Sequence, residues 1–369
     1  MGLQRKIILK KEISDNIPFM IKVLDLSQSS IWNKFLAEVP HSNLDIYFTP
    51  EYYSLYESNG DGLARCFVFQ NEMGIALYPF LLNEVPKHFN LSKTYYDIQG
   101  AYGYNGIIFS NESKEFIDLF YLNFNEFCIQ NNIIAEFTRF HPVLKNQTFS
   151  EGNMDILMDR KVVSLDLQNS IEKIWTDSYS SNNRNMIRKA QKNGVEVLVS
   201  EEETDYDAFF HIYTETMENV QASQFYFFDR GYIDDFKIKL KDNHKLLVAK
   251  FEGQVICAML MMYKGDYAHY HLSGRKKEFS KLAANNLMLH KAIETAKELG
   301  CKHFHFGGGT SSAEDDFLFK FKSNFSKNIL DFKIGKKVHF PEIYTEVVLN
   351  WEQNNPDKSD SKLLLKYRE

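Results

Sequence analysis

The stretch KLLVAKFEGQVICAMLMMYKGDYAHYHLS, residues 245–273, decides the fold that we expect for this chain. Its apolar patterning predicts three strands, over Lys245 to Phe251, Gln254 to Tyr263 and Tyr267 to Ser273. Glu252-Gly253 supplies the chemistry of a tight turn between the first two strands. The three strands are therefore predicted to form a meander.

The segments on either side of this meander extend it into an α/β domain. Downstream, apolar residues from Leu289 to Leu299 recur with helical spacing, Gly300 ends that helix, and Cys301 to Phe306 is predicted as a strand. A strand, a helix and a further strand in succession imply a parallel crossover. The elements predicted upstream are a helix, a strand and a helix, over Ser180 to Asn193, Val195 to Val199 and Tyr206 to Met217.

The first half of the chain shows the same mixture. Arg65 to Phe69 and Gly74 to Leu82 are predicted as paired strands, and Phe116 to Gln130 has helical spacing. Arg160 to Leu167 alternates like a strand and precedes a helix-rich stretch. Because 369 residues exceed what one hydrophobic core usually serves, we predict two α/β domains with mixed sheets, residues 1–167 and 168–330.

Composition and charge exclude several classes of protein. The four cysteines are far apart and form no C-x-x-C pair, so neither a disulfide framework nor a zinc ribbon is indicated. The charged N-terminus has no apolar signal core after it, and Lys6 stands where a myristoylation signal needs Ser or Thr. The longest apolar run, Ile256 to Tyr263, is far shorter than the roughly 20 residues that span a bilayer. A net charge of −6 argues against a protein that coats nucleic acid, and we expect a cytoplasmic protein.

Two segments carry groups that suit a phosphate or an oxyanion. Arg184, Arg188 and Lys192 are spaced by four on a predicted helix, so they form a basic stripe that either binds a phosphate-bearing substrate or only faces solvent. Phe304 to Phe306 runs into Gly307-Gly308-Gly309, whose N–H groups either bind an anion or only turn the chain.

Histidines alternate on two predicted strands. His269 and His271 share one face, and Cys301, His303 and His305 share one face of the next strand. Zinc sites usually need a convergent tetrahedral set, so we expect no metal and assign His271 a substrate contact instead.

A last segment combines aromatic and basic residues. Alternate Phe residues from Phe317 to Phe325 predict an amphipathic strand with Lys320 and Lys322 on its polar face. Two lysines placed in this way would neutralise an anionic intermediate. The alternative is an ordinary amphipathic strand.

Taken in order, these segments resemble the Fem-type aminoacyltransferases and the related acetyltransferase-fold (GNAT) proteins of envelope polysaccharide pathways. The order of the segments carries the resemblance more than any one motif. The matching stretches are Tyr96-Asp97 with Tyr102 to Gly106, Glu136 to Pro142, Asn183 to Gly194, Thr216-Met217 with Phe225-Tyr226, His269 to Ser273 with Ala284 to Asn286, and Phe306 to Gly309 with Phe319 to Phe325.

The resemblance implies tandem GNAT-like domains with an acceptor cleft between them, and a segment over residues 331–369 that returns to the first domain. It also implies transfer of an aminoacyl group from aminoacyl-tRNA, or of an acyl group from acyl-CoA, with no tightly bound cofactor. By the same analogy, Lys322 stabilises the oxyanion or a donor phosphate, and Asp97 or His271 gives general-base help. The expected substrate-binding residues are Tyr102, Tyr104, Arg139, His141, Arg184, Arg188, Tyr226 and Asn286.

Two departures from the family pattern keep alternatives open. Gln221 to Phe225 stands where the interpeptide-bridge enzymes carry Arg-Asp-x-Phe, and Lys281 to Asn286 replaces the glycine-rich turn of acetyl-CoA enzymes. One hypothesis is therefore aminoacyl transfer from tRNA to an envelope precursor, with peripheral contact to the inner membrane. The second is N-acylation of a nucleotide-linked amino sugar by acyl-CoA. The third is an inactive module that binds a glycan precursor or a partner protein.

Overall fold

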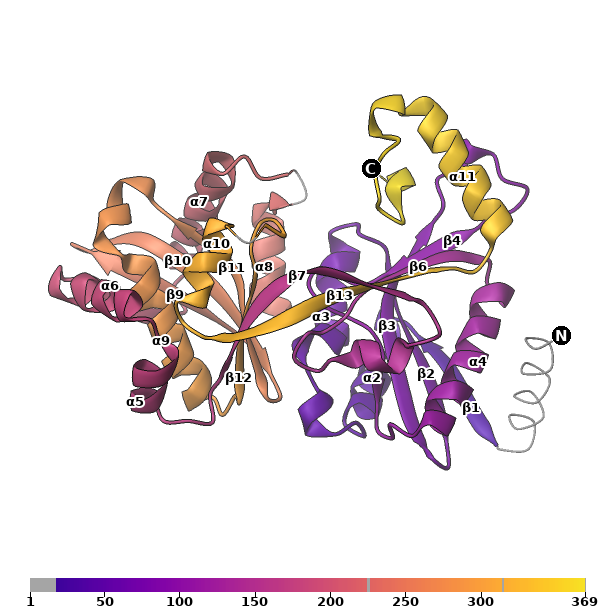
Figure 1. Ribbon diagram of the computed structural model, residues 1–369, viewed down its shortest axis with the longest axis horizontal. Helices are drawn as coiled ribbons and strands as arrows, with labels where there is room; N and C mark the ends of the chain where they lie inside the picture. The colour runs from indigo at the N-terminus through magenta and orange to yellow at the C-terminus, as the bar shows by residue number, and fades with distance from the viewer. Residues whose placement is uncertain (1–17, 224–225, 314, 369) are drawn as a thin grey trace. The chain divides into compact units, whose positions relative to one another are not determined.

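A computed structural model of the protein describes residues 18–223, 226–313 and 315–368 (Figure 1). Two features named in the sequence analysis lie outside these residues: the charged N-terminal stretch and Phe225. The chain forms two compact units. The first comprises Met1–Asn43, Tyr47–Asp159 and Phe332–Glu369, and the second comprises Leu44–Ile46 and Arg160–Asp331.

The first unit contains a mixed sheet in the order β1-β2-β3-β4-β6-β13. β4 and β6 are parallel, and the other neighbours in this sheet are antiparallel. The strands are β1 (Phe19–Leu24), β2 (Leu63–Asn71), β3 (Gly74–Glu84), β4 (Tyr96–Gln99), β5 (Ile108–Phe109), which pairs with β3, β6 (Ile133–Arg139) and β13 (Asn328–Val338). The helices are α2 (Ser29–Leu36), α3 (Pro50–Ser58), α4 (Lys114–Gln130) and α11 (Pro341–Asn354).

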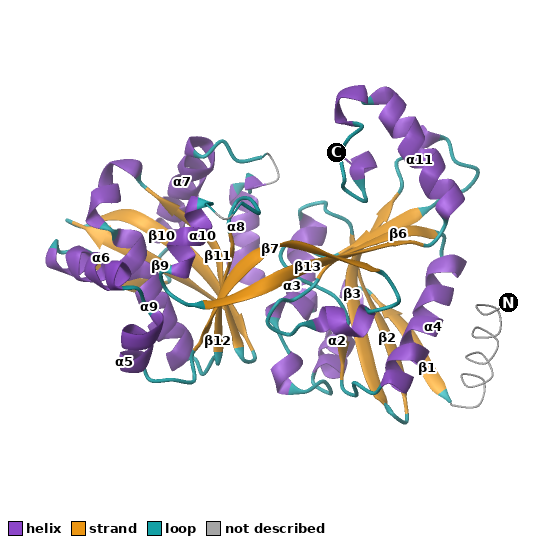
Figure 2. Cartoon of the chain, in the orientation of Figure 1, coloured by secondary structure: helices purple, strands orange, loops and turns teal. Residues whose placement is uncertain are grey.

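The second unit contains the predicted meander in a sheet of order β7-β12-β11-β10-β9-β8, where β11 and β12 are parallel. The strands are β7 (Asp155–Asp166), β8 (Glu196–Ser200), β9 (His244–Phe251), β10 (Gln254–Lys264), β11 (Tyr267–Arg275) and β12 (His303–Gly308). The helices are α5 (Ile171–Lys173), α6 (Ser181–Lys192), α7 (Glu203–Asn219), α8 (Arg230–Lys239), α9 (Ala284–Glu298) and α10 (Phe317–Ser323). Figure 2 shows helices flanking the strands of this unit. Both units therefore confirm the predicted α/β class with mixed sheets.

Each unit has its own apolar core, as the length of the chain predicts. In the first, aromatic side chains of α4 such as Phe120 and Phe124 pack on Phe67 of β2, and all three are completely buried. In the second, Ile187 of α6 and Ala292 of α9 pack against one face of the sheet. The helical spacing of apolar residues in these segments is what buries them.

The segment from Phe317 to Phe325 forms the helix α10 (Phe317–Ser323) and a turn at Asn324-Phe325, so the predicted strand is wrong. Asp316 caps α10, because its Oδ1 accepts a hydrogen bond from the Phe319 N–H at 2.9 Å. Phe317 is 91% exposed while Phe325 is completely buried, which a strand with one apolar face does not allow. The helix also separates the two lysines, since Lys322 is buried and Lys320 is exposed.

The sequence analysis placed Cys301 on the same strand face as His303 and His305, and this prediction is also wrong. β12 begins only at His303, and Cys301 lies in the turn before it, where its side chain joins the core cluster of Phe304 and Phe306. His305 is on the opposite face, where its ring lies 5.8 Å from that of His269. Strand alternation does not extend across a turn, which is why the sequence pattern failed here.

Candidate active site

The parallel strands β11 and β12 separate partway along their length. They pair only from Tyr267 with His303 to His269 with His305. Beyond that point each strand keeps its outer neighbour: β12 stays paired with β7, through Gly307 with Val163, and β11 with β10. The edges that β11 and β12 turn toward each other are therefore not paired with each other at this end of the sheet.

Lys322 of α10 lies between the two separated strands. Its Nζ donates a hydrogen bond to the Gly308 carbonyl of β12 at 2.7 Å, and it lies 5.2 Å from the ring centroid of Tyr270 on β11. The side chain is buried, with a relative exposure of 5%. Burial lowers the pKa of Lys322 to about 7, against the opposing effect of Asp316 and in concert with Arg160. A lysine ammonium that is desolvated in this way interacts strongly with a negative charge placed beside it.

The glycine-rich loop after β12 already holds an anion, which is the carboxylate of Asp316. Asp316 Oδ2 accepts hydrogen bonds from the N–H groups of Thr310 and Ser311, both at 3.0 Å, and from their hydroxyls. Burial disfavours the ionised form, but the hydrogen bonds outweigh it and hold the pKa of Asp316 well below its usual range. The N–H groups of Thr310 and Ser311, which directly follow the three glycines, are thus used within the chain.

His271 lies at a bulge of β11, where Leu260 and Met261 of β10 pair with Leu272 and Tyr270. Its Nε2 is 3.3 Å from the Tyr232 hydroxyl, and its ring stacks on Phe236 at 5.3 Å. Burial lowers the pKa of His271 to about 3, so the imidazole is neutral at physiological pH. A neutral imidazole can accept a proton, but its surroundings here disfavour holding one.

Asp97 is in the first unit and is completely buried. Its carboxylate accepts hydrogen bonds from Arg368 Nε at 2.9 Å, Arg368 Nη2 at 2.6 Å and the Tyr367 hydroxyl at 2.9 Å. Burial raises the pKa of Asp97, and Arg368 partly offsets this effect. These contacts bind residues 367–368 to β4, and the role of Asp97 as a base stays a prediction.

The predicted basic stripe on α6 divides into two kinds of side chain. Arg184 turns back on the chain, where its Nη1 donates to the carbonyls of Trp175, Thr176 and Tyr179 at 3.2, 3.3 and 2.6 Å. It thereby satisfies carbonyls at the end of a π-helical turn, Ile174–Ser178. Arg188 is exposed, and its guanidinium lies 5.3 Å from the Trp175 ring.

Asn286 joins the first turns of two helices. Its Nδ2 donates to Oδ1 of Asn183 at 2.8 Å, which links the start of α9 to the start of α6. Asn183 is completely buried and its Nδ2 has no hydrogen-bond partner among the described residues. Tyr226, by contrast, is 38% exposed, and its carbonyl accepts from the Tyr213 hydroxyl at 2.8 Å.

The remaining predicted binding residues lie together in the first unit, around the loop after β4. Arg139 Nη2 donates to the carbonyls of Gly100 and Ala101 at 2.8 and 3.1 Å, and burial lowers the pKa of this guanidinium. The Tyr104 ring meets the His141 ring edge to face at 5.5 Å, and the Tyr102 carbonyl accepts from Tyr52 at 2.6 Å. The Arg139 side chain thus binds the loop after β4 to the end of β6.

Sequence reasoning missed three groups beside Lys322: Asp316, Arg160 and Tyr270. Asp316 had a usable signal, because an Asp directly before an apolar run is typical of a helix N-cap. Arg160, whose Nη1 donates to the Gly309 and Thr310 carbonyls at 3.2 and 3.4 Å, is 149 and 150 residues away from them in the chain. No local pattern reports such a contact.

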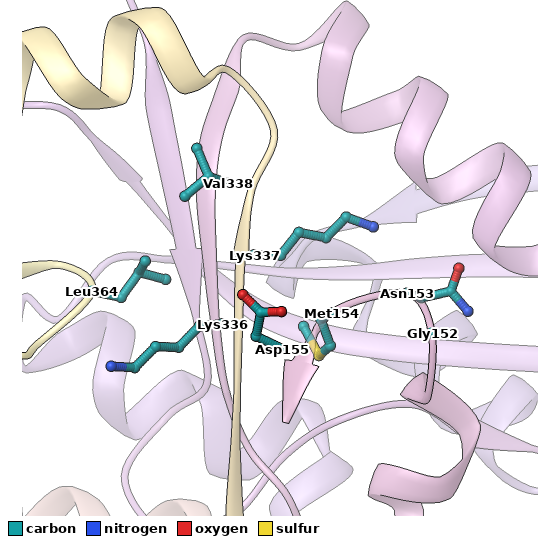
Figure 3. A pocket seen from close by; sticks show the side chains of 8 residues that line it. All are labelled: Gly152, Asn153, Met154, Asp155, Lys336, Lys337, Val338 and Leu364. Atoms are coloured by element: carbon teal, nitrogen blue, oxygen red, sulfur yellow. The ribbon is translucent and has the colours of Figure 1, made fainter. Parts of the chain in front are cut away.

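A recess of about 530 Å³ lies in the first unit, between the turn before β7 and the end of β13 (Figure 3). Its lysines are engaged: Lys336 Nζ donates to the Lys362 carbonyl and Lys337 Nζ to Asn125 Oδ1, both at 2.6 Å. Asp155 is the acidic side chain of its lining. No predicted site residue lines this recess, and we assign it no role in the chemistry.

Comparisons with known proteins show similarity in sequence and in fold. The family model for acetyltransferase (GNAT) domains matches residues 178–322, a range that ends on Lys322. The UDP-N-acetylmuramoylpentapeptide-lysine N(6)-alanyltransferase of Weissella viridescens is 26% identical over 217 residues, which cover 56% of this chain and 62% of that relative. The chain thus matches less than two thirds of the length of this relative.

Solved structures share the fold. The crystal structure of FemX superposes with a TM-score of 0.67 at 14% identity, covering 88% of this chain and 99% of that one. The structure of L-PGS from Bacillus licheniformis gives a TM-score of 0.55 at 14% identity, covering 84% and 91%.

The family model and the shared fold make the second unit similar to acetyltransferase (GNAT) domains. Over longer stretches of the chain, the likeness is to this alanyltransferase in sequence and to FemX in fold. Among the described residues, every helix is too short or too polar to cross a bilayer.

Proposed function

We propose that this protein is an acyltransferase that moves an aminoacyl group onto an amine of a bacterial cell-envelope precursor. The observation that supports this most is Lys322, a buried cation held between β11 and β12 by the Gly308 carbonyl. The sequence relative is named for alanyl transfer to a lysine of a UDP-N-acetylmuramoylpentapeptide, and this motivates the choice of acceptor.

The chemistry needs a neutral amine and a stabilised oxyanion. The amine nitrogen attacks the ester carbonyl of the donor, a C–N bond forms, and the carbonyl oxygen becomes negative. When the C–O bond to the donor hydroxyl breaks, that hydroxyl leaves with the proton that the amine loses. The Lys322 ammonium is the group of this chain that compensates the negative oxygen, and its fixed hydrogen bond to Gly308 limits its reorganisation.

The side chains need not form a covalent intermediate. Bringing two bound reactants together supplies a large part of the acceleration of such reactions. The four cysteines are buried, and burial raises the pKa of each thiol, which makes them poor nucleophiles.

A second donor, acyl-CoA, is favoured by one observation, the match to acetyltransferase domains over residues 178–322. It conflicts with the turn before α9, where Lys281 to Asn286 has no glycine to let the backbone approach a pyrophosphate. We therefore place aminoacyl-tRNA first among the donors.

The test is a transfer assay followed by mass spectrometry. Purified protein is incubated with UDP-N-acetylmuramoyl-pentapeptide and either alanyl-tRNA or acetyl-CoA. We expect the mass of the precursor to rise by one aminoacyl residue with the charged tRNA. An acetylated product would instead support the acyl-CoA reading. Absence of product with both donors, across other aminoacyl-tRNAs and amino-sugar acceptors, would contradict the proposal and favour a binding module.

A further inference from the structure

The Asp316 carboxylate is the centre of a hydrogen-bonded clamp in the second unit. Its Oδ1 accepts from the Phe319 N–H at 2.9 Å, which caps α10. Its Oδ2 accepts from the N–H and hydroxyl of Thr310, at 3.0 and 2.7 Å, and from those of Ser311, at 3.0 and 3.2 Å. One buried side chain therefore ties the start of α10 to the loop that follows β12.

Gly309 leaves room for this clamp. A Cβ at this position would lie 2.3 Å from Asp316 Oδ1, a distance that no side-chain carbon tolerates. From the other side, Arg160 Nη1 donates to the Gly309 and Thr310 carbonyls. The N–H groups of the loop thus bond to the Asp316 carboxylate, and its carbonyls bond to the Arg160 guanidinium. The loop therefore has little freedom to move.

Both ends of the Lys322 hydrogen bond depend on this clamp. Lys322 is on α10, the helix that Asp316 caps, and its acceptor Gly308 directly precedes the loop that Asp316 holds. Loss of the carboxylate would free both the helix and the loop. We propose that Asp316 is a positioning residue that fixes the Lys322 ammonium for acyl transfer. The part of this inference that concerns transfer rests on the proposed function.

The charges around Lys322 make the proposal measurable. The described groups that act on its ammonium are Asp316 before α10, Arg160 on β7 and the ring of Tyr270 on β11. Burial lowers the pKa of Lys322 to about 7, Asp316 raises it and Arg160 lowers it. Removal of the Asp316 charge therefore lowers the pKa of Lys322 further, so the cation is lost at a lower pH.

The first experiment titrates the lysines of the whole protein by NMR, with ¹³Cε and ¹⁵Nζ labels assigned by the loss of one signal in Lys322→Met. We expect the Lys322 signal to titrate near pH 7 in the unaltered protein and at lower pH in Asp316→Asn. Asp229→Asn is the matched control, because Asp229 caps a different helix, α8, through the Tyr232 N–H at 2.8 Å and is not among the charged groups that act on the Lys322 ammonium. An unchanged Lys322 titration in Asp316→Asn would overturn the proposal.

Transfer kinetics give the second readout. Asp316→Asn and Gly309→Ala are both expected to lower kcat by about 10-fold or more with little change in KM, because they displace a group that acts in the transition state. The alkaline limb of kcat/KM should move to lower pH in Asp316→Asn and stay in place in Asp229→Asn. Equal losses in Asp316→Asn and Asp229→Asn would mean that Asp316 only stabilises the fold, and would refute its positioning role.

Chemical rescue separates positioning from folding. Asp316→Ala vacates the space between four loop donors and the helix N–H, which a formate ion fits by charge and size. We expect formate, and not chloride at equal ionic strength, to restore part of kcat and to return the Lys322 titration toward pH 7. Absence of rescue by formate in a folded variant would count against the clamp. Because the NMR titration needs no turnover, it reports on Asp316 even if the transfer assay fails.

Discussion

Arg368→Met is expected to destabilise the first unit, because it leaves the buried Asp97 carboxylate without its cation. Asp97 is completely buried, and Arg368 supplies its charged partner through Nε and Nη2 at 2.6 to 2.9 Å. Breaking a buried ion pair from one side typically costs about 3 to 5 kcal/mol. Arg368 Nη2 also donates to the Glu84 carbonyl at 3.0 Å, so the upper part of this range is the expected loss.

The pH dependence of this loss follows from the pKa of Asp97. Burial already raises this pKa above its unfolded value, and Arg368 lowers it, so removal of Arg368 raises it further. A carboxyl with a raised folded pKa favours the folded state at low pH, and this contribution is lost as the pH rises through the folded pKa. The deficit of Arg368→Met should therefore be large at neutral pH and should shrink as the pH falls.

The assay is urea denaturation of wild type, Arg368→Met, Asp97→Asn and the double variant, at about pH 7.5 and about pH 5. Asp97→Asn removes the buried charge, so Arg368→Met should cost much less in that background. A loss below about 1 kcal/mol at neutral pH would refute the structural role of this pair. A stable Asp97→Asn protein without transfer activity would support the predicted role of Asp97 as a base.

Three further predictions test other parts of the account. The kcat/KM for transfer should fall as the pH rises through about 7, because the Lys322 ammonium deprotonates. Lys322→Arg should abolish this alkaline fall in kcat/KM, since a guanidinium stays charged. An unchanged fall in Lys322→Arg would assign it to another group. Arg184→Met should lower the free energy of unfolding by about 1 to 3 kcal/mol, because three carbonyls lose a donor. Arg188→Met, at an exposed position, should change this free energy little. A larger loss for Arg188→Met than for Arg184→Met in denaturant titration would contradict this assignment. Phe325→Ala should lower the free energy of unfolding by about 3 to 5 kcal/mol, because the side chain is buried, and Phe317→Ala by less than about 0.5 kcal/mol, because it is exposed. Equal losses in calorimetry would argue for the strand.

Much of the fold was predictable because its signals are local. The meander from β9 to β11, the helix α9 that ends before Gly300, and the parallel strand β12 follow from apolar periodicity and turn residues. The error at Phe317 to Phe325 has a local cause too. Alternate Phe residues fit a strand, but the Asp316 cap and the local contact between Phe321 and Phe325, four residues apart, favour a helical turn.

The site was less predictable because its contacts join distant parts of the chain. Lys322 was found through a family resemblance, whereas its burial depends on helix α10 and on the separation of β11 from β12. Arg184 appears in the sequence as part of a basic stripe, and only the fold shows that it bonds to backbone carbonyls. Charge patterns report what a side chain can do, and the neighbouring backbone decides which partner it takes.

The measurement that tests the central claim most directly is single-turnover transfer by Lys322→Met and Lys320→Met. The two lysines share one helix and one chemistry, but Lys322 is buried between the separated strands and Lys320 is exposed. The account predicts that Lys322→Met slows transfer by about 10²- to 10³-fold, as loss of an oxyanion donor does, while it stays folded and Lys320→Met keeps the wild-type rate. Wild-type transfer by a folded Lys322→Met protein would contradict it.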